Sequence, residues 1–114
     1  MARQGTTPIV SLEVEHSFDG CDAFVTIDQD GIQVTKSSMT SEDIEITEHY
    51  DEEGVFDYSI VAMYLTQAET LGFEVGNARV QIRWVDAAGN ADATEIGTFR
   101  IEESLLQEVI EYGN

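Results

Sequence analysis

Ala-Phe-Val-Thr-Ile-Asp-Gln-Asp-Gly-Ile-Gln-Val-Thr-Lys, residues 23–36, is the stretch that most directly predicts the fold. β-Branched and aromatic residues on both sides of Asp30-Gly31 are typical of two strands joined by a tight turn. An Asp-Gly pair suits that turn, because hairpin turns need backbone conformations with positive φ. The stretch therefore predicts a β-hairpin.

Similar strand-like stretches occur on both sides of this hairpin. Residues 55–65 are apolar on both faces, which favours a central strand covered on both sides. The expected strands are residues 9–15, 23–28, 32–36, 43–47, 55–65, 78–86 and 94–101. Short strands with turns about every ten residues are typical of a β-sandwich or a partly open barrel. We therefore expect an all-β fold, a small Ig-like or jelly-roll-like sandwich of about seven strands.

Two segments carry the signature of a helix start. Thr66-Gln67-Ala68-Glu69 fits a capping box, in which the Thr and Glu side chains each bond the other residue's backbone, and predicts a helical turn near 66–71. Ser104-Leu105-Leu106-Gln107 fits the same pattern and predicts a short C-terminal helix over 105–112. An α+β arrangement in which both helices are larger stays open as an alternative.

The chain has the size of one domain. Its 114 residues suffice for a single hydrophobic core but not for two. Residues 1–7 are small and polar, and we expect them to form a flexible N-terminal arm. Residues 8–114 then form one sandwich domain that includes the C-terminal helix. The chain has no apolar run of about eighteen residues and no apolar segment near Met1, so we expect neither a spanning helix nor a signal peptide.

The balance of charge is the most unusual bulk property. Twenty-three Asp and Glu face five Lys and Arg, which gives a formal net charge of −18. Binding to nucleic acid or to an anionic membrane needs clustered cations, which so few basic residues supply poorly. The 42% of hydrophobic residues distinguishes the chain from disordered acidic tails. Solubility is the simplest interpretation of the acidity, with a basic partner, imitation of the charge of DNA, or divalent cations as alternatives.

Few residues suited to catalysis are present. The histidines are His16, beside an expected turn, and His49, in an acidic stretch. Cys21 lies close to His16 in sequence, but its surroundings are acidic, and a reactive thiolate needs a positive environment. A single cysteine forms no intramolecular disulfide, which fits a reducing cytoplasm. We therefore expect no catalytic residues and no enzymatic activity.

Carboxylates are clustered in three expected turns, at residues 19–22, 28–31 and 51–54. Calcium sites take their oxygen ligands from such loops. The pattern Asp28-x-Asp30-Gly31 lacks the third acidic position and the distal glutamate of an EF-hand, and a hairpin turn explains it without a metal. His and Cys are too few for a tetrahedral zinc site. We expect no metal site and no cofactor.

The C-terminal segment carries the pattern that most favours a functional role. Its expected helix presents an apolar stripe made of Leu105, Leu106, Val109 and Ile110. Because a helix of about eight residues is marginal in isolation, this stripe must be buried. It can pack against the chain's own sandwich, or against the groove of a partner or a second copy.

Two arginines form a second candidate contact surface. Strand alternation turns Arg79 and Arg83 outward and Trp84 inward. Because the chain has so few cations, we expect each arginine to meet a carboxylate, either within the chain or across an interface.

Several of these stretches resemble small virion- or tail-associated β proteins of phages and prophages of Gram-positive gut bacteria. The resemblance covers most of residues 9–110, and its most specific segments are Leu65-Thr66-Gln67-Ala68-Glu69-Thr70 and Val80-Gln81-Ile82-Arg83. The last hairpin pattern is also similar, more weakly, to the N-terminal β domains of phage upper-baseplate proteins. Both resemblances imply a β-sandwich structural component of a virion, and neither implies catalytic residues.

We therefore expect a non-enzymatic virion structural protein of the tail or baseplate, a connector or the capsid surface, assembled in the cytoplasm of a bacterial host. Its expected partners are other virion proteins, further copies of itself in a homo-oligomer, or both, and neither nucleic acid nor a membrane. The alternative hypothesis is an acidic mimic of DNA that inhibits a nucleic-acid-binding protein of the host. A third hypothesis is a calcium-stabilised adhesion module.

Overall fold

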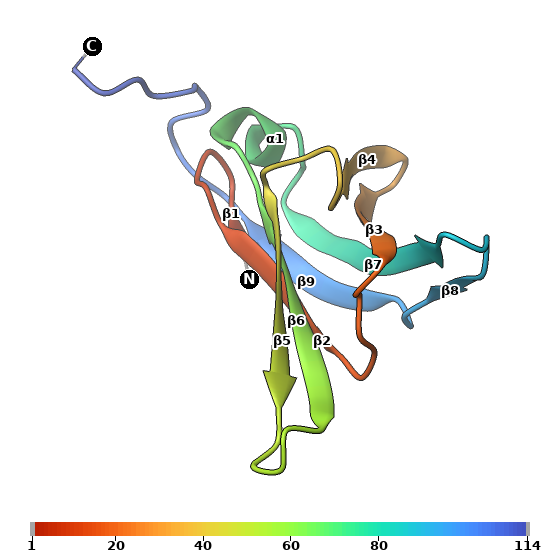
Figure 1. Ribbon diagram of the computed structural model, residues 1–114. Helices are drawn as coiled ribbons and strands as arrows, with labels where there is room; N and C mark the ends of the chain where they lie inside the picture. Colours follow the sequence, from red (N-terminus) through yellow and green to blue (C-terminus); the bar gives the residue numbers. More distant parts are fainter. Residues whose placement is uncertain (1, 114) are drawn as a thin grey trace.

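The computed structural model describes residues 2–113 and contains two β-sheets and one short helix (Figure 1). The elements are β1 (Ala2–Arg3), β2 (Ile9–Val14), β3 (Cys21–Gln29), β4 (Ile32–Ser37), β5 (Ile44–Tyr50), β6 (Phe56–Tyr64), α1 (Gln67–Leu71), β7 (Gly76–Asp86), β8 (Ala91–Ala93) and β9 (Gly97–Glu102). The expected all-β fold is confirmed. No helix within the described residues is long and apolar enough to cross a membrane.

The strands are divided between two sheets. One sheet has the order β1-β9-β7-β3-β4, with β8 paired to β7, and the other has the order β2-β6-β5. β1 and β9 run parallel, whereas the other pairs are antiparallel. The chain passes between the sheets after β1, β2, β4 and β6, which is the strand arrangement of an Ig-like sandwich. The expected β-sandwich is therefore confirmed.

The hairpin expected over residues 23–36 is formed by β3 and β4. Gln29 pairs with Ile32, so Asp30 and Gly31 alone make the turn. Both turn residues have positive φ, 49° at Asp30 and 90° at Gly31, as a two-residue hairpin turn requires. The hairpin prediction is confirmed, and the structure adds its register and includes Gln29 in the first strand.

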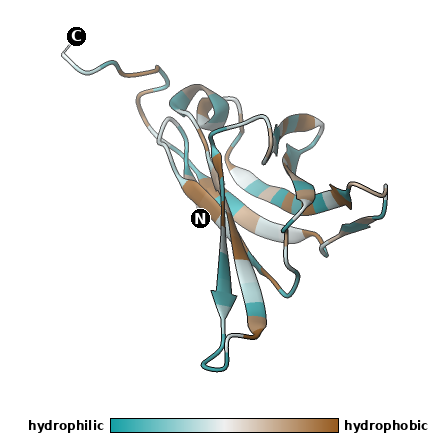
Figure 2. Cartoon of the chain, in the orientation of Figure 1, coloured by the Kyte–Doolittle hydropathy of each residue, from teal (hydrophilic) through white to brown (hydrophobic). Residues whose placement is uncertain are grey.

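Strand alternation places the core between the two sheets. Val25, Ile27 and Ile82 from one sheet, and Val61 and Met63 from the other, are each at most 2% exposed. Figure 2 shows the resulting alternation of hydrophobic and hydrophilic residues along the strands. Burying a side chain of this size stabilises a protein by about 1.5–3 kcal/mol, so this layer dominates the stability of the fold.

β6 differs from its prediction in one respect. It is the central strand of its sheet, and its residues Ser59, Val61 and Met63 are buried, as expected. Its other face carries Tyr58 and Ile60, which are partly exposed. The expected cover on both faces is therefore wrong, because the second sheet covers one face of β6 and no third layer lies over the other.

The helical turn expected near 66–71 is confirmed as α1. The Thr66 hydroxyl accepts a hydrogen bond from the Glu69 backbone N–H at 3.1 Å, and the Glu69 carboxylate accepts one from the Thr66 N–H at 2.8 Å. This reciprocal pair is the capping box that the sequence predicts. The helix then ends at Leu71, with Gly72 as its C-cap.

A partly buried cation joins α1 to both sheets. The ammonium group of Lys36 in β4 donates to the carboxylates of Asp43 and Glu69 and to the Tyr64 carbonyl, each at 2.8 Å. Burial favours a lower pKa for Lys36, but the hydrogen bonds to Asp43 and Glu69 outweigh burial and hold the pKa above its ordinary value. The Lys36 side chain is 10% exposed, so these contacts are shielded from water.

The N-terminal residues do not form the expected flexible arm. Ala2 and Arg3 pair with Ile101 and Glu102 as β1, and Ala2 is 4% exposed. The buried side chain of Gln4 donates to the Phe73 carbonyl at 2.7 Å. The arm prediction is wrong here because pairing with the edge of β9 satisfies backbone groups that a local sequence pattern does not reveal.

The expected C-terminal helix over 105–112 is absent. Residues 103–113, here called the C-terminal segment, have no helix or strand, and they extend away from the sandwich (Figure 1). A helix this short is marginal in isolation and needs a surface on which to bury its apolar stripe, and the stripe residues here are each at least 53% exposed. The α+β alternative is also wrong, because α1 spans five residues.

Candidate interaction surfaces

The outer face of the larger sheet is built around β7. Alternation turns Trp84 into the core, where it is 8% exposed, and turns Arg79 and Arg83 outward, as expected. The strand pairing of β7 with β3 places Asp28 opposite Arg79 and Phe24 opposite Arg83. Each arginine therefore has a different neighbour across the sheet.

Arg79 meets a carboxylate within the chain. Its guanidinium donates to Asp28 at 2.7 Å, and the Asp28 side chain is 13% exposed. The hydrogen bonds from Arg79 and then from Gln33 hold the pKa of Asp28 below its ordinary value. This pair joins β3 to β7, so Arg79 has a structural role.

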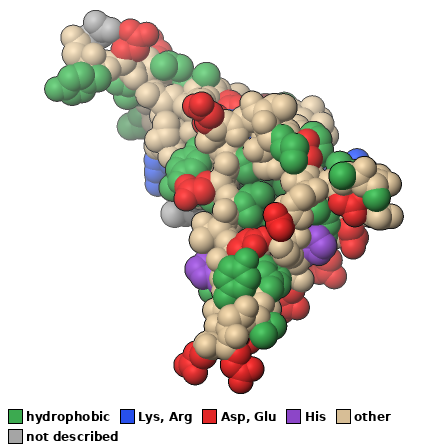
Figure 3. Space-filling view, in the orientation of Figure 1, with side chains coloured by type: hydrophobic (Ala, Val, Ile, Leu, Met, Phe, Trp, Pro, Cys, Tyr) green, Lys and Arg blue, Asp and Glu red, His purple; other side chains and the backbone are tan. Residues whose placement is uncertain are grey.

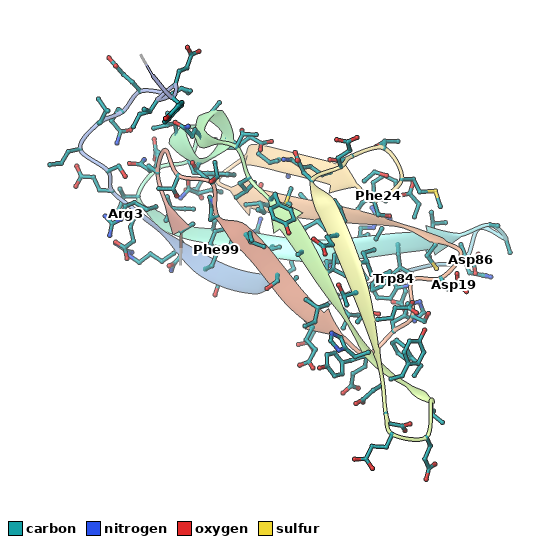
Figure 4. The ribbon with its side chains drawn as sticks, turned by 60° about the vertical axis from the view of Figure 1, so that its left-hand side comes forward. Arg3, Asp19, Phe24, Trp84, Asp86 and Phe99 are labelled. Carbon is teal, nitrogen blue, oxygen red and sulfur yellow. The ribbon has the colours of Figure 1, made fainter. Side chains whose placement is uncertain are left out.

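Arg83 makes no hydrogen bond or ion pair through its side chain with any other residue in the described range, 2–113. It borders an open, largely apolar hollow of about 380 Å³. This hollow, here called the Arg83 hollow, is lined by Phe24, Thr26, Thr35, Arg83, Trp84, Val85 and Ala91. Figure 4 shows Phe24 and Trp84 toward the same end of the sandwich, with Arg3 at the opposite end.

One side of the Arg83 hollow is polar and the other apolar. The hydroxyl groups of Thr26 and Thr35 hydrogen-bond each other at 2.9 Å across β3 and β4. On the other side of Arg83 lie Val85 and Ala91, which face each other across β7 and β8. The hollow thus combines a cation, an apolar floor and hydroxyl groups, which suits a ligand with both a carboxylate and an apolar group.

The C-terminal segment exposes the apolar side chains that were expected to be buried. Each side chain of the expected stripe is at least 53% exposed (Leu105, Leu106, Val109 and Ile110), and so is that of Tyr112. Figure 3 shows hydrophobic side chains along this projecting segment. The segment therefore presents apolar surface that the sandwich does not cover.

Polar contacts hold the C-terminal segment to the sandwich. The Ser104 hydroxyl donates to the Gln4 carbonyl at 2.6 Å, and Gln107 donates to the Gln4 side chain at 2.9 Å. The Gln67 amide of α1 bonds both the N–H and the carbonyl of Ile110, at 2.7 and 2.9 Å. The backbone of the segment is thereby positioned while its apolar side chains stay open to solvent.

The structure groups the predicted contact residues into two separate surfaces. Arg79 and Arg83 share the outer face of the larger sheet, whereas the four apolar residues of the expected helix lie together near β1 and α1. Phe24, not singled out from the sequence, is 37% exposed beside Arg83. Strand alternation could have found Phe24, because inward-facing Val25 and Ile27 turn the side chain at position 24 outward, and the sequence has a phenylalanine there.

Both histidines pack against aromatic rings. His16 stacks on Trp84 with ring centroids 4.7 Å apart, and Phe18 contacts both rings edge-on. His49 stacks on Tyr58 at 4.6 Å. Within the described chain no hydrogen bond joins His16 to the partly buried Cys21. These contacts give the histidines packing roles at the sandwich surface.

The carboxylates of the acidic turns accept hydrogen bonds from backbone groups. Asp51 accepts from the N–H groups of Glu53 and Val55 at 2.9 Å each. Asp86 accepts from the Asn90 backbone, and this hydrogen bond lowers the pKa of Asp86. Between residues 2 and 113, no three His, Cys, Asp or Glu side chains are arranged to hold a metal ion. The turn carboxylates therefore have a structural explanation.

No known protein family matches the chain, and no curated protein does. Among solved structures, an uncharacterized protein of Listeria monocytogenes EGD-e, lmo2446, is similar with a TM-score of 0.47 and 16% sequence identity. The match covers 88% of this chain and 8% of that one, so the chain spans a small part of the length of this neighbour. At this level of similarity the comparison carries no argument about function.

Proposed function

We propose that this chain is a non-enzymatic assembly module of a phage virion, acting in the tail or baseplate, a connector or the capsid surface. Its partners are other virion proteins, further copies of itself, or both. The observation that supports assembly is the C-terminal segment, whose five large apolar side chains are each at least 53% exposed. Full burial of an exposed Leu, Val or Ile side chain contributes about 1.5–3 kcal/mol, and the half-exposed side chains here would contribute a corresponding part of that when covered by a partner.

The Ig-like sandwich supports this role as a rigid carrier. Its core is closed by residues from both sheets, and Lys36 fixes α1 next to the site where Gln67 holds the segment. A rigid carrier lowers the entropy lost when the segment binds, because its backbone is already positioned. The assignment to a virion derives from the resemblance of residues 65–70 and 80–83 to phage proteins.

The test compares two substitutions that each replace an exposed apolar side chain with aspartate. Leu106→Asp lies in the C-terminal segment, and Met39→Asp is a control at a loop position that is 68% exposed. Leu106→Asp should leave thermal unfolding unchanged and abolish incorporation of the protein into purified particles, whereas Met39→Asp should leave both unchanged. Unchanged incorporation of Leu106→Asp would overturn the role assigned to the segment.

The acidic-decoy hypothesis stays a prediction from the net charge of −18. It requires that the protein compete with duplex DNA for a basic nuclease, in a complex that weakens as salt is raised. Absence of such competition would remove it.

A further inference from the structure

We propose that the C-terminal segment of one copy of this chain binds the Arg83 hollow of a second copy. The inference rests on the assembly role proposed above and names both faces of one contact. It gives the protein a head-to-tail mode of self-association, with the apolar segment as one face and the outer side of β7 as the other.

The first argument concerns the interactions of the Arg83 side chain. In a chain with 23 acidic and five basic residues, the other cations are engaged. Lys36 meets two carboxylates, Arg79 and Arg100 meet one each, and Arg3 donates to the Glu103 carbonyl. Arg83 has no acceptor within residues 2–113 and lies beside exposed apolar surface. Such a site is complementary to a carboxylate carried on an apolar chain.

The second argument is the chemistry of the C-terminal segment. The segment bends at Leu105 and Glu108, so the proposed contact requires residues 106–110 to straighten on binding. Once they are extended, alternate side chains share one face, and Leu106, Glu108 and Ile110 point the same way. An apolar group and a carboxylate are then separated by two residues, about 7 Å. Arg83 and Val85 are also two residues apart on one face of β7, with the same spacing of about 7 Å. Glu108 can therefore meet Arg83 while Leu106 or Ile110 covers Val85.

The third argument is that the C-terminal segment does not contact the Arg83 hollow of its own chain. Ile101 pairs with Gly76, and Arg83 lies seven residues farther along β7 (76 to 83), a distance of about 23 Å. The segment runs away from that end of the sandwich (Figure 1), and contacts with Gln4 and Gln67 hold it there. Contact with its own Arg83 would require the loss of these hydrogen bonds and a complete reversal of direction. A second copy meets the hollow without either change.

The two faces of this contact are different, so the association is heterologous. Heterologous contacts close into rings or continue as open chains, depending on the rotation between neighbours. Because each copy carries a net charge of −18, copies repel one another at low salt. Raising the ionic strength to about 0.15 M shortens the screening length to about 8 Å, so long-range repulsion falls while the close contact persists. We expect self-association to strengthen with salt over this range, which is opposite to the behaviour of a complex with a basic partner.

The test is a complementation experiment with two full-length variants. Arg83→Glu disables the hollow and keeps the segment, whereas Leu106→Asp with Ile110→Asp disables the segment and keeps the hollow. Each variant alone should be monomeric by light scattering, and an equimolar mixture should form a 1:1 heterodimer. No other pairing of surfaces yields this pattern, because the mixture contains one intact face of each kind.

A matched pair of substitutions measures the contribution of the cation. Arg83→Gln should weaken self-association by about tenfold, because it removes one partner of a shielded charge pair. Arg79→Gln, the same change on the same face, should leave association within about twofold, because Arg79 already pairs with Asp28. Combining Arg83→Glu with Glu108→Arg should restore association.

Three results would overturn the inference. One is a wild-type chain that stays monomeric at every salt concentration. The second is a mixture of the two variants that stays monomeric. The third is association that depends on the segment but is unaffected by Arg83→Glu, which would indicate exchange of segments between copies at the Gln4 and Gln67 contacts. Loss of particle incorporation by Leu106→Asp under any of these results would leave the assembly role standing and remove its self-association form.

Discussion

The N-terminal and C-terminal parts of the chain meet at Gln4 and Ser104, yet they contribute differently to the molecule. Residues 2–4 are Ala, Arg and Gln, and they are built into the sandwich, with Ala2 and Gln4 at most 8% exposed. Residues 103–113 carry more apolar surface and remain outside it, although Ser104 bonds the backbone of Gln4. Backbone pairing with β9, and not apolar content, decides which end becomes part of the fold.

The two ends differ in how many residues must be ordered for each hydrogen bond that is gained. β1 gains backbone hydrogen bonds along an existing strand, so ordering it fixes few residues for each bond formed. A helix at residues 105–112 would have to form its own first turn without a surface to cover its stripe. The N-terminal end therefore stabilises the fold, and the C-terminal end is left available for another molecule.

The largest expected effect is on the strand that joins the two ends. Ile101 in β9 is fully buried opposite Ala2, so Ile101→Ala should lower the free energy of unfolding by about 2–5 kcal/mol through the cavity it leaves. Leu105→Ala removes comparable apolar volume four residues later and should change it by less than about 0.5 kcal/mol. Chemical denaturation of both variants provides the measurement, and equal losses would contradict the division between the two ends.

A smaller effect is expected at the contact between the two ends. Gln4→Ala leaves the buried Phe73 carbonyl without its donor and should cost about 1–3 kcal/mol. Gln107→Ala removes the other partner of Gln4 from the exposed side and should cost less than about 0.5 kcal/mol. Denaturation midpoints would show this asymmetry, and a larger loss for Gln107→Ala would mean that the C-terminal segment is part of the folded unit.

The pH dependence of α1 provides a third comparison. Burial favours a raised pKa for Glu69, but the hydrogen bond from Lys36 and the backbone N–H of Thr66 outweigh it, and the pKa lies below its ordinary value of 4.5. A carboxyl with a lowered pKa in the folded state stabilises above its ordinary value and loses that contribution as the pH falls through the folded value. Glu69→Gln should therefore cost about 1 kcal/mol at pH 7, and the cost should shrink progressively as the pH falls below 4.5 toward pH 3.

Glu108→Gln is the matched control for this series, because Glu108 lies in the exposed C-terminal segment. It should leave the stability of the isolated chain unchanged between pH 3 and pH 7. A Glu69→Gln deficit that persists unchanged at pH 3 would show that its cause is packing around α1 and not the charge of the carboxylate.

The smallest expected effect on stability is that of the segment itself. Leu106→Asp should change the unfolding free energy of the monomer by less than about 0.5 kcal/mol, because Leu106 is 53% exposed and packs on no buried layer. A loss of more than about 1 kcal/mol would place Leu106 in the core of the fold. Thermal unfolding at a concentration where the protein is monomeric separates this effect from assembly.

The parts of this fold that could be predicted from the sequence are those set by neighbouring residues. Asp30-Gly31 fixes its hairpin because its own backbone conformation makes the turn, and Thr66 and Glu69 cap α1 across three residues. β1 was missed because its partner lies 99 residues away, from Ala2 to Ile101, and no local pattern records that pairing. The C-terminal helix was predicted from a stripe whose burial depends on surfaces outside the segment.

The candidate surfaces also combine features that the local sequence predicts with features that depend on strand pairing. Alternation alone turns Arg79 and Arg83 outward, and that much was predicted. Only the register of β3 against β7 shows that Arg79 faces Asp28 while Arg83 faces Phe24. The difference between a paired and an available arginine is therefore a property of strand pairing, which the sequence of β7 does not contain.

The most direct test of the account is the mass in solution of the wild-type chain and of the Leu106→Asp, Ile110→Asp variant, measured by light scattering across a range of salt. The account predicts a multiple of the 12.6 kDa protomer for the wild type, increasing with salt, and the protomer mass for the variant at every salt concentration. Identical masses for the two proteins under all conditions would contradict it, because the exposed C-terminal segment would then have no part in association between copies.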